Sequence, residues 1–380
     1  MNTEKTNVFQ RIDFNLIFIL FLLAVISLVA IYSSSPGHFY TQLTWYIIGF
    51  VIMMLSLLID YRRLMDLSWP LYISGVLLLL YVAFFGVEAK GAQSWIQIGN
   101  FFRIQPAEFM KIFLVISIAH LVTKWQEKQE EKSLKNDIIL TIKIALISIL
   151  PFGLIVTQPD LGTAMVIIGM IAVMLIVSGI SWRILVLLLI LGISVIMGLV
   201  FLYFTNIEIF NMIIKQHQLP RIISWLDPEA DPKNTGYQLI QSLLAIGSGQ
   251  LVGKGFTEGS QIQGGWIPEV HTDFIFAVIG EEFGFIGASV LVSVFFILVY
   301  RLVQIALSCN DLFGSYVVAG IIGLIVFQVF QNIGMTIGVV PITGIALPFI
   351  SYGGSALVTN MLAMGIVLNI AMRTKNYMFD

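Results

Sequence analysis

The sequence predicts an all-α polytopic membrane protein with ten transmembrane helices in a single domain, residues 1–380. Two observations predict this fold class. Of the residues, 58% are hydrophobic and 11% are charged, whereas about a quarter of the residues of a soluble domain are charged. The apolar residues also gather in runs of about 20, the length that an α-helix needs to cross the hydrocarbon core of a bilayer.

The apolar runs place the ten spans in order along the chain. We expect them at 14–32, 43–59, 69–86, 106–122, 138–156, 162–180, 184–204, 273–300, 314–336 and 354–372. The first run is too long for a signal-peptide core and lacks a small-residue cleavage site, so we interpret it as a retained span.

One long segment, 205–272, separates the seventh and eighth spans. Its apolar residues Ile207, Phe210, Ile213 and Ile214 keep a helical spacing against Asn211 and Lys215, which predicts a helix lying in the membrane interface. The stretches at 221–238 and 245–265 are rich in Pro and Gly, and we expect turns there.

Basic residues in the loops predict the orientation, because cytoplasmic loops carry an excess of Lys and Arg. One face of the predicted topology carries Lys5, Arg11, Arg62, Arg63, Lys124, Lys128, Lys132, Lys135, Arg183, Arg301, Arg373 and Lys375. The short loops of the other face carry Lys90 and Arg103, while Lys215, Arg221, Lys233 and Lys254 lie in the long segment, which the rule discounts. Both termini are therefore predicted to be cytoplasmic, and segment 205–272 to be external.

Charge and cysteine content exclude two classes of function. The formal net charge is −2 without a basic block, so the sequence has no footprint for nucleic acid. The single cysteine, Cys309, excludes an internal disulfide and a cysteine-cluster metal site.

Four polar clusters fall on the predicted external face, each before a span that runs inward. They are Arg103 to Lys111, Gln158 to Thr163, the 221–273 segment and Ser351 to Ser355. Helix N-termini carry partial positive charge and unpaired N–H groups, so a site for an anionic ligand is easily built there. Any ten-span protein with this orientation has such ends, so the geometry permits a site without establishing one.

Two of these clusters contain charged residues with alternative interpretations. Lys111 opposes the dipole at its helix start, so we expect it to pair with Glu108, three residues earlier on the same face. That pair is either purely structural or also lines a polar cavity. Asp160 is suited to cap the helix that follows it, or to contribute to a site.

The acidic residues of IPEVHTDFIFAVIGEEFGFIG, 267–287, pose the same choice. Asp273 stands where a polar approach becomes apolar, so it either caps the eighth span or serves a site. Glu281 and Glu282 follow roughly 12 Å further along, and we expect them to pair with buried donors as structural residues. His271 is expected to be a hydrogen-bonding interfacial residue, and Ser355 either caps the tenth span or binds an anion.

Seven motifs together resemble the SEDS family, which includes FtsW, RodA and SpoVE. They are IDYRRL at 59–64, KGAQSWI at 90–96, FRIQPAEFMK at 102–111, QPDLGTA at 158–164, GYQLIQSLLAIGSG at 236–249, PEVHTDFIFAVIGEEFG at 268–284 and PITGIALPFISYGGS at 341–355. They occur in family order over nearly the whole chain, and the short tails and the wording of the last two motifs are closer to the RodA branch than to the FtsW branch.

The resemblance implies a peptidoglycan glycosyltransferase with a ten-helix fold. Such an enzyme polymerises lipid II, the undecaprenyl-diphosphate-linked disaccharide pentapeptide, on the outer face of the bacterial cytoplasmic membrane during cell elongation and shape maintenance. It works with a class B penicillin-binding protein transpeptidase and other membrane proteins of the elongation complex. The implied catalytic aspartate is Asp273, with Glu108, Lys111 and Asp160 lining the same cavity and Arg103 and Gln105 near its rim.

The chemistry assigns tasks to these residues. Asp273 would act as general base on the attacking sugar hydroxyl. The departing diphosphate needs positive charge, from Arg103, Lys111, Arg221, Lys254, a helix N-terminus or a divalent cation such as Mg²⁺ or Mn²⁺. Ser351 and Ser355 complete the expected substrate-binding residues. One base and direct displacement predict inversion at the anomeric carbon.

Two alternatives from other classes stay open. Intramembrane charges also suit a flippase that carries a lipid-linked sugar across the bilayer, although alternating access would place polar groups at both mouths. A noncatalytic scaffold for cell-wall enzymes is the other alternative, and it would make Asp273→Asn harmless.

Overall fold

The computed structural model describes residues 12–89, 92–98, 102–128, 133–158, 160–206, 209–210, 219–231 and 235–374. Several residues used for predictions lie outside these ranges, and they are Lys5, Arg11, Lys90, Lys132, Ile207, Asn211, Ile213, Ile214, Lys215, Lys233 and Lys375. The predicted interfacial helix is thus untested except at Phe210, which is buried.

Each predicted span coincides with a helix. The helices are α1 (Phe14–Ser34), α2 (Phe39–Ser56), α4 (Ser68–Phe85), α5 (Pro106–Glu127), α6 (Leu134–Thr157), α7 (Leu161–Val177), α8 (Trp182–Thr205), α13 (Ile275–Ser308), α14 (Leu312–Thr336) and α15 (Gly354–Arg373). Within the described ranges, nine helices are long and apolar enough to cross a membrane, while α7 has 17 residues. The all-α polytopic fold is confirmed, and the tenth span stays a prediction.

Local chemistry explains where several helices begin. The carboxylate of Asp13 accepts the N–H of Leu16 at 3.1 Å at the start of α1, and the carboxylate of Asp160 accepts the N–H of Thr163 at 2.9 Å at the start of α7. Pro106 occupies the first position of α5, where its missing N–H removes no helical bond.

The connections contain more structure than the sequence predicts. Short elements are η2 (Pro36–His38), α3 (Arg62–Asp66), α10 (Leu219–Leu226), η3 (Pro228–Ala230) and α12 (Ser260–Gln263). Between α4 and α5, strands β1 (Val87–Ala89), β2 (Ala92–Ile98) and β3 (Phe102–Ile104) form an antiparallel sheet in the order β1-β2-β3. Ile96 pairs with Ile104, and Gln97 pairs with Arg103.

The prediction of turns at 221–238 and 245–265 is wrong where these stretches fall in α10, in α12 and in the two ends of α11 (Thr235–Ser248). Its buried residues Leu239, Ser242 and Ala245 recur at three-residue spacing along one face, and the helix packs against α13 and α14. Packing of this face against α13 and α14 stabilises the helix despite its polar residues and glycines.

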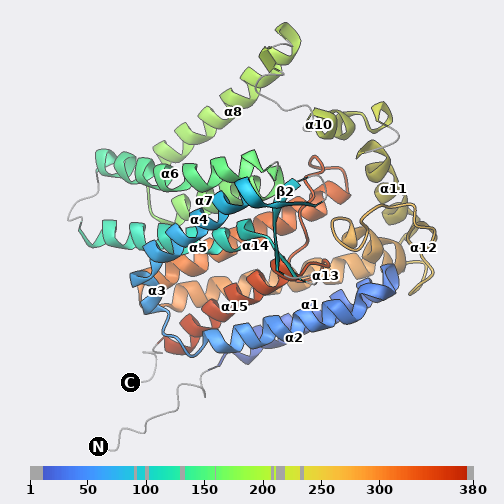
Figure 1. The fold of residues 1–380 in the computed structure, drawn as a ribbon, viewed down its shortest axis with the longest axis horizontal. Coiled ribbons are helices and arrows are strands. Elements are labelled where there is room, and N and C mark those ends of the chain that lie inside the picture. The colour runs from blue at the N-terminus through green and yellow to red at the C-terminus, as the bar shows by residue number, and fades with distance from the viewer. Residues whose placement is uncertain are drawn as a thin grey trace, which may run out of the picture.

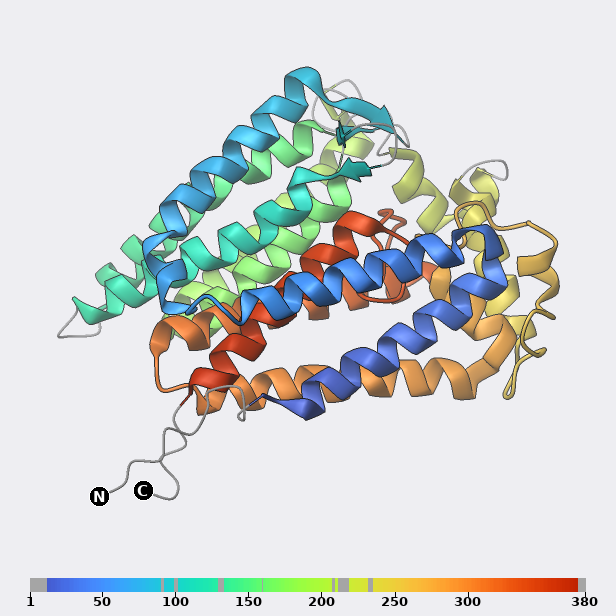
Figure 2. The same cartoon turned by 60° about the horizontal axis from the view of Figure 1, so that its bottom comes forward.

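Apart from α8, the spanning helices lie side by side in one bundle, with α5, α14 and α15 largely buried inside it (Figures 1 and 2). The elements α10, α11 and α12 gather at one end of the bundle, and α15 ends at the opposite end, near α3. Only Ile184 of α8 is buried, and this helix runs away from the bundle in Figure 1. The starts of α5, α7 and α15 and the turn before α13 all face the end that carries α10–α12.

Candidate functional site

Asp273 lies in the turn that precedes α13. The residue is half-buried, and its N–H donates to the carbonyl of Glu269 at 3.2 Å. The side-chain amide of Asn332 on α14 donates to the Asp273 carbonyl at 2.8 Å. The N-cap of α13 is Phe274, which makes no side-chain capping bond. The N-cap position is therefore one residue later than the one predicted for Asp273.

The 337–353 loop, which joins α14 to α15, holds this turn in place. The hydroxyl of Ser351 donates to the carbonyl of Thr272 at 2.6 Å and accepts the N–H of Leu347 at 2.8 Å. The N–H of Tyr352 donates to the carbonyl of His271 at 2.9 Å. Ser351 is buried, so in this structure its hydroxyl fixes the loop beside the catalytic candidate.

The same loop brings a backbone segment and an arginine to Asp273. Gly344 has a φ of +72°, and a Cβ placed on it would lie 3.3 Å from Oδ2 of Asp273. The guanidinium of Arg221 on α10 donates to the carbonyl of Thr343 at 3.3 Å. The carboxylate of Asp273 therefore faces Gly344, and Arg221 is anchored one residue away.

A second group of polar residues gathers at the start of α5. The ammonium of Lys111 lies 2.9 Å from Oε2 of Glu108, and both residues are buried. This confirms the predicted pair. Because an unpaired ammonium in an apolar bundle is costly, Glu108 is what allows a lysine at this position.

The starts of α7 and α15 meet the start of α5. The side-chain amide of Gln105 donates to Oδ2 of Asp160 at 2.8 Å, and its main-chain N–H donates to the hydroxyl of Ser355 at 3.2 Å. Ser355 in turn donates to the carbonyl of Arg103 at 3.1 Å. The N-cap of α15 is Gly353. The prediction that Ser355 caps α15 is wrong, and its hydroxyl instead ties α15 to the approach to α5, where Arg103 is exposed.

The electrostatic surroundings of Asp160 join it to the Glu108–Lys111 pair. Burial raises the pKa of the Asp160 carboxyl, and hydrogen bonds from the N–H and hydroxyl of Thr163 oppose that rise. The charge of Glu108 raises the same pKa further, and the charge of Lys111 lowers it. The pKa of Asp160 therefore depends on the charges of both Glu108 and Lys111.

The two groups of residues meet at Thr343 and Ile345. A Cβ added to Gly162, at the start of α7, would lie 2.5 Å from Cγ1 of Ile345 and 2.9 Å from the carbonyl oxygen of Thr343. These two residues flank Gly344, which faces Asp273. The 343–345 segment thus has Asp273 on one side and the start of α7, with its cap Asp160, on another.

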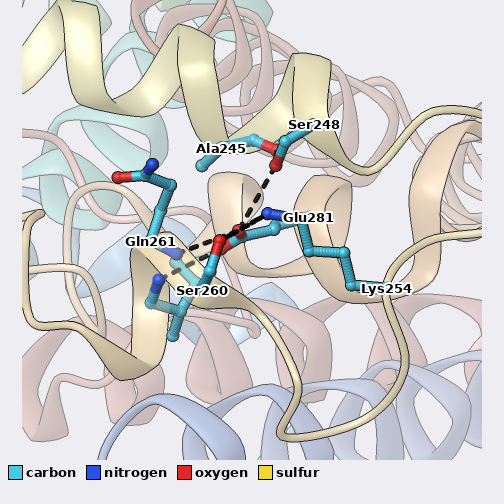
Figure 3. A network of polar contacts seen from close by, with 7 residues as sticks. Ala245, Ser248, Lys254, Ser260, Gln261 and Glu281 are labelled. Carbon is cyan, nitrogen blue, oxygen red and sulfur yellow. Dashed lines mark hydrogen bonds and ion pairs between the residues drawn. The ribbon is translucent and has the colours of Figure 1, made fainter.

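Lys254 is placed elsewhere. Its ammonium lies 2.6 Å from Oε1 of Glu281, and Glu281 is fully buried (Figure 3). The hydroxyl of Ser33 on α1 donates to Glu282, which is also buried. These contacts support the structural interpretation of both acids. They also compensate the charge of Lys254, which the sequence left open as a ligand for diphosphate.

Sequence reasoning missed two residues of this arrangement. Asn332 donates from one side-chain amide to the carbonyls of Asp273 and Ile345, at 2.8 and 2.7 Å. Its signal was its place among three amides, with Gln328 and Gln331, inside an apolar run, since such residues in spans often hydrogen-bond across helices. Gly344 carried no signal beyond its being a glycine. Within the described residues, no group of three or more His, Cys, Asp or Glu side chains is placed to hold a metal ion.

Comparison with protein families places this arrangement among known proteins. A family model described as cell cycle protein, and named for FtsW, RodA and SpoVE, matches residues 9–376. The probable peptidoglycan glycosyltransferase FtsW of Geobacter metallireducens is 37% identical over 96% of this chain and 96% of its own length. Stage V sporulation protein E of Bacillus subtilis is 37% identical over 98% of this chain and 99% of its own length.

Solved structures agree with this family. A chain from a study of how a peptidoglycan synthase complex coordinates polymerization and crosslinking has a TM-score of 0.78, with 30% identity over 95% of this chain and 97% of that chain. The rod shape determining protein RodA of Thermus thermophilus has a TM-score of 0.70, with 26% identity over 96% of this chain and 98% of that chain. Relatives from several branches match nearly the full length, so identity alone does not assign a branch.

Proposed function

The chain belongs to the SEDS family of cell cycle proteins, which includes FtsW, RodA and SpoVE, and from this membership we propose that it is a peptidoglycan glycosyltransferase that polymerises lipid II. Relatives that match nearly its whole length carry that activity in their names. The single observation that carries the assignment of the site is the position of Asp273, whose carboxylate faces the 343–345 segment.

Asp273 is the general base in this proposal. The hydroxyl at carbon 4 of one sugar displaces the lipid diphosphate from the anomeric carbon of another, and it becomes a strong nucleophile only if a base takes its proton as the bond forms. The main chain of Asp273 is held by Asn332 and Glu269, which supports a carboxylate with a fixed starting geometry.

Positive charge near this base stabilises the leaving group. Arg221 donates to a neutral carbonyl one residue from Gly344, and that bond does not neutralise its charge. Lys111 is paired with Glu108, so the pair presents less net charge than a free lysine. We therefore assign the diphosphate chiefly to Arg221, with exposed Arg103 contributing from the middle of β3.

The remaining candidates shape the substrate cavity. Gln105 forms hydrogen bonds with both Asp160 and Ser355, and Ser355 donates to the carbonyl of Arg103. These three residues lie at the starts of three helices, so they are preorganised to meet polar groups of the sugar or peptide. Because the diphosphate is already an acidic leaving group, no second carboxylic acid is required. A single displacement by one base inverts the anomeric centre and gives a β-linked glycan from an α-linked donor.

The proposal includes an orientation, a partner and an occasion. The site lies at the end of the bundle opposite the C-terminus of α15. With both termini in the cytoplasm, the site faces the outer leaflet, where lipid II is available. A solved relative belongs to a complex that polymerises and crosslinks peptidoglycan, which supports a class B penicillin-binding protein transpeptidase as partner. The wording of the motifs at 268–284 and 341–355, which is closer to the RodA branch, supports a role in elongation.

In the decisive experiment, labelled lipid II is added to the purified protein and a transpeptidase partner inactivated for crosslinking, and the products are separated on a gel. Wild type is expected to make long glycan strands, and Asp273→Asn is expected to lose them by a factor of at least about 10² because the base is gone. Asp311→Asn is the matched control, since Asp311 precedes α14 at the other end of the bundle and accepts the N–H of Phe313.

Three outcomes would contradict the proposal. Strands made at the wild-type rate by Asp273→Asn would refute the role of Asp273 as the base. Absence of strands from wild type, without transfer of lipid II between leaflets, would favour a noncatalytic scaffold. Failure of wild type to form strands, with transfer of labelled lipid II between the leaflets of a vesicle, would favour a flippase.

A further inference from the structure

Helix α13 is broken at Gly284. This residue has a φ of 63° and a ψ of −161°, outside the helical region, although the helix continues on both sides. A Cβ at this position would lie 2.3 Å from the nitrogen of Gly253 and 2.7 Å from the carbonyl oxygen of Leu251, so only glycine fits against the chain that passes here. The passing chain is residues 249–263, which we name the clamp loop.

The clamp loop takes over the main-chain hydrogen bonds that the break removes. In an unbroken helix the N–H groups of Phe285 and Ile286 would donate to the carbonyls of Glu281 and Glu282. Instead, Phe285 donates to the carbonyl of Gln250 at 2.9 Å and Ile286 to that of Leu251 at 3.1 Å. The two carbonyls left behind accept from the loop, at 3.0 Å from Lys254 and 3.1 Å from Gly255. Two helical bonds are thus replaced by four bonds to the loop.

The side chain of Glu281 ties both halves of the clamp loop to the helix (Figure 3). Its Oε1 lies 2.6 Å from the ammonium of Lys254 and accepts the N–H of Gln261 at 3.0 Å. Its Oε2 accepts the N–H of Ile262 at 3.0 Å. The ammonium of Lys254 also donates to the hydroxyl of Ser260 at 2.6 Å. Glu281 is completely buried, whereas the Lys254 side chain is 27% exposed.

The break makes the part of α13 before Gly284 a separate helical segment, Ile275–Phe283. The part after Gly284, as far as Ser308, is about 36 Å long at ~1.5 Å per residue, which is enough to cross a bilayer of about 30 Å by itself. The spanning part therefore does not fix the direction of the first segment. That segment begins directly after Asp273 and its turn, so whatever fixes its far end also fixes the base.

We propose that the Glu281–Lys254 ion pair is a positioning device for the glycosyl transfer reaction: it locks the clamp loop into the break of α13 and thereby sets where Asp273 stands against Gly344. The inference rests on the proposed function. Neither residue touches the substrate. Both act through the Ile275–Phe283 segment, which is pinned by the 337–353 loop at one end and by the clamp loop at the other.

The test measures kcat and KM for labelled lipid II in the full-length protein with its transpeptidase partner. Lys254→Met and Glu281→Gln are expected to lower kcat about 10- to 100-fold, the loss that follows from a displacement of the base by up to about 1 Å. KM is expected to stay within about twofold, because substrate contacts are unchanged. Lys254→Arg keeps the charge and should recover most of kcat.

Two further variants separate positioning from stability. The double variant Lys254→Met/Glu281→Gln leaves no uncompensated buried charge, so it should fold as wild type does and still lose kcat. Arg301→Met removes a different ion pair of the same helix, in which the guanidinium lies 2.8 Å from Asp13 beyond the break. It should lower thermal stability and leave kcat unchanged.

Each contrary result is distinct. Normal kcat in the folded double variant would overturn the inference, and so would an equal loss of kcat in Arg301→Met. A raised KM at unchanged kcat in Lys254→Met would assign Lys254 to the substrate instead. Absence of glycan strands from wild type would refute the proposed function rather than the positioning role of the Glu281–Lys254 pair.

Discussion

Gly344→Ala tests whether the 343–345 segment sets the geometry of the base. Gly344 has a φ of +72°, and an alanine there adds a Cβ that lies 3.3 Å from Oδ2 of Asp273. Two separate effects follow from this one methyl group. The left-handed backbone costs about 1–2 kcal/mol for a residue with a side chain, and the carboxylate must withdraw by a few tenths of an ångström to relieve the contact.

The magnitude of the second effect follows from the contact distance. A displacement of about 1 Å in an active site can cost roughly 100-fold in rate, so a few tenths of an ångström is expected to cost about 3- to 10-fold. In activation free energy this is about 0.7–1.4 kcal/mol. The loss should appear in kcat, because the base acts in the transition state and the ground-state contacts of lipid II are unchanged.

Gly338→Ala is the matched control in the same loop. Gly338 has a φ of +76°, so an alanine there meets the same backbone strain, but the nearest atom to its Cβ would be Cδ1 of Leu239 at 3.8 Å. Thermal unfolding in detergent should therefore show similar destabilisation of both variants, and gel-resolved synthesis of glycan strands should show a slower rate for Gly344→Ala alone. Equal rates for the two variants would refute the idea that Asp273 is placed by contact with Gly344.

Two further predictions concern buried polar groups around the base. Lys111→Met should destabilise the protein by about 3–5 kcal/mol because Glu108 is left as an unpaired buried charge. The double variant Glu108→Gln/Lys111→Met should restore thermal stability without restoring polymerisation. If it restored both, the pair would be purely structural. Asn332→Leu should cost about 1–3 kcal/mol for each carbonyl left without its donor, those of Asp273 and Ile345, and should lower kcat in the strand assay; a stability loss at full kcat would contradict its part in holding the base.

Short-range chemistry made part of this site predictable from sequence. Pro106 begins α5, Asp160 caps α7 and Lys111 pairs with Glu108. Each of these features involves residues no more than four positions apart, so the rules of helix ends and of neighbouring side chains determine them. The spans were predictable for a similar reason, because a bilayer selects apolar runs of a fixed length.

The contacts that connect distant segments were not predictable from local patterns. Ser355 and Asp273 both looked like helix caps, yet Ser355 bonds to the carbonyl of Arg103 and α13 begins after Asp273. The N-cap of α13 lies one residue after Asp273 and the N-cap of α15 lies two residues before Ser355, and the tertiary fold decides such boundaries. Glu281, the ion-pair partner of Lys254, is 27 residues away on another element. The sequence therefore shows that Lys254 is charged but not which residue it pairs with.

The Glu108–Lys111 and Glu281–Lys254 pairs suggest a common reason for charges in this bundle. A buried pair is weak evidence for stability, since well-packed apolar residues of similar volume often stabilise a fold as well or better. A pair does, however, impose a direction and a distance that apolar contacts do not. Glu108–Lys111 lies in the first turn of α5, and Glu281–Lys254 holds the break in the helix that follows Asp273. Both pairs fix the segments that carry the proposed site, so removing both charges of either pair should harm catalysis more than folding.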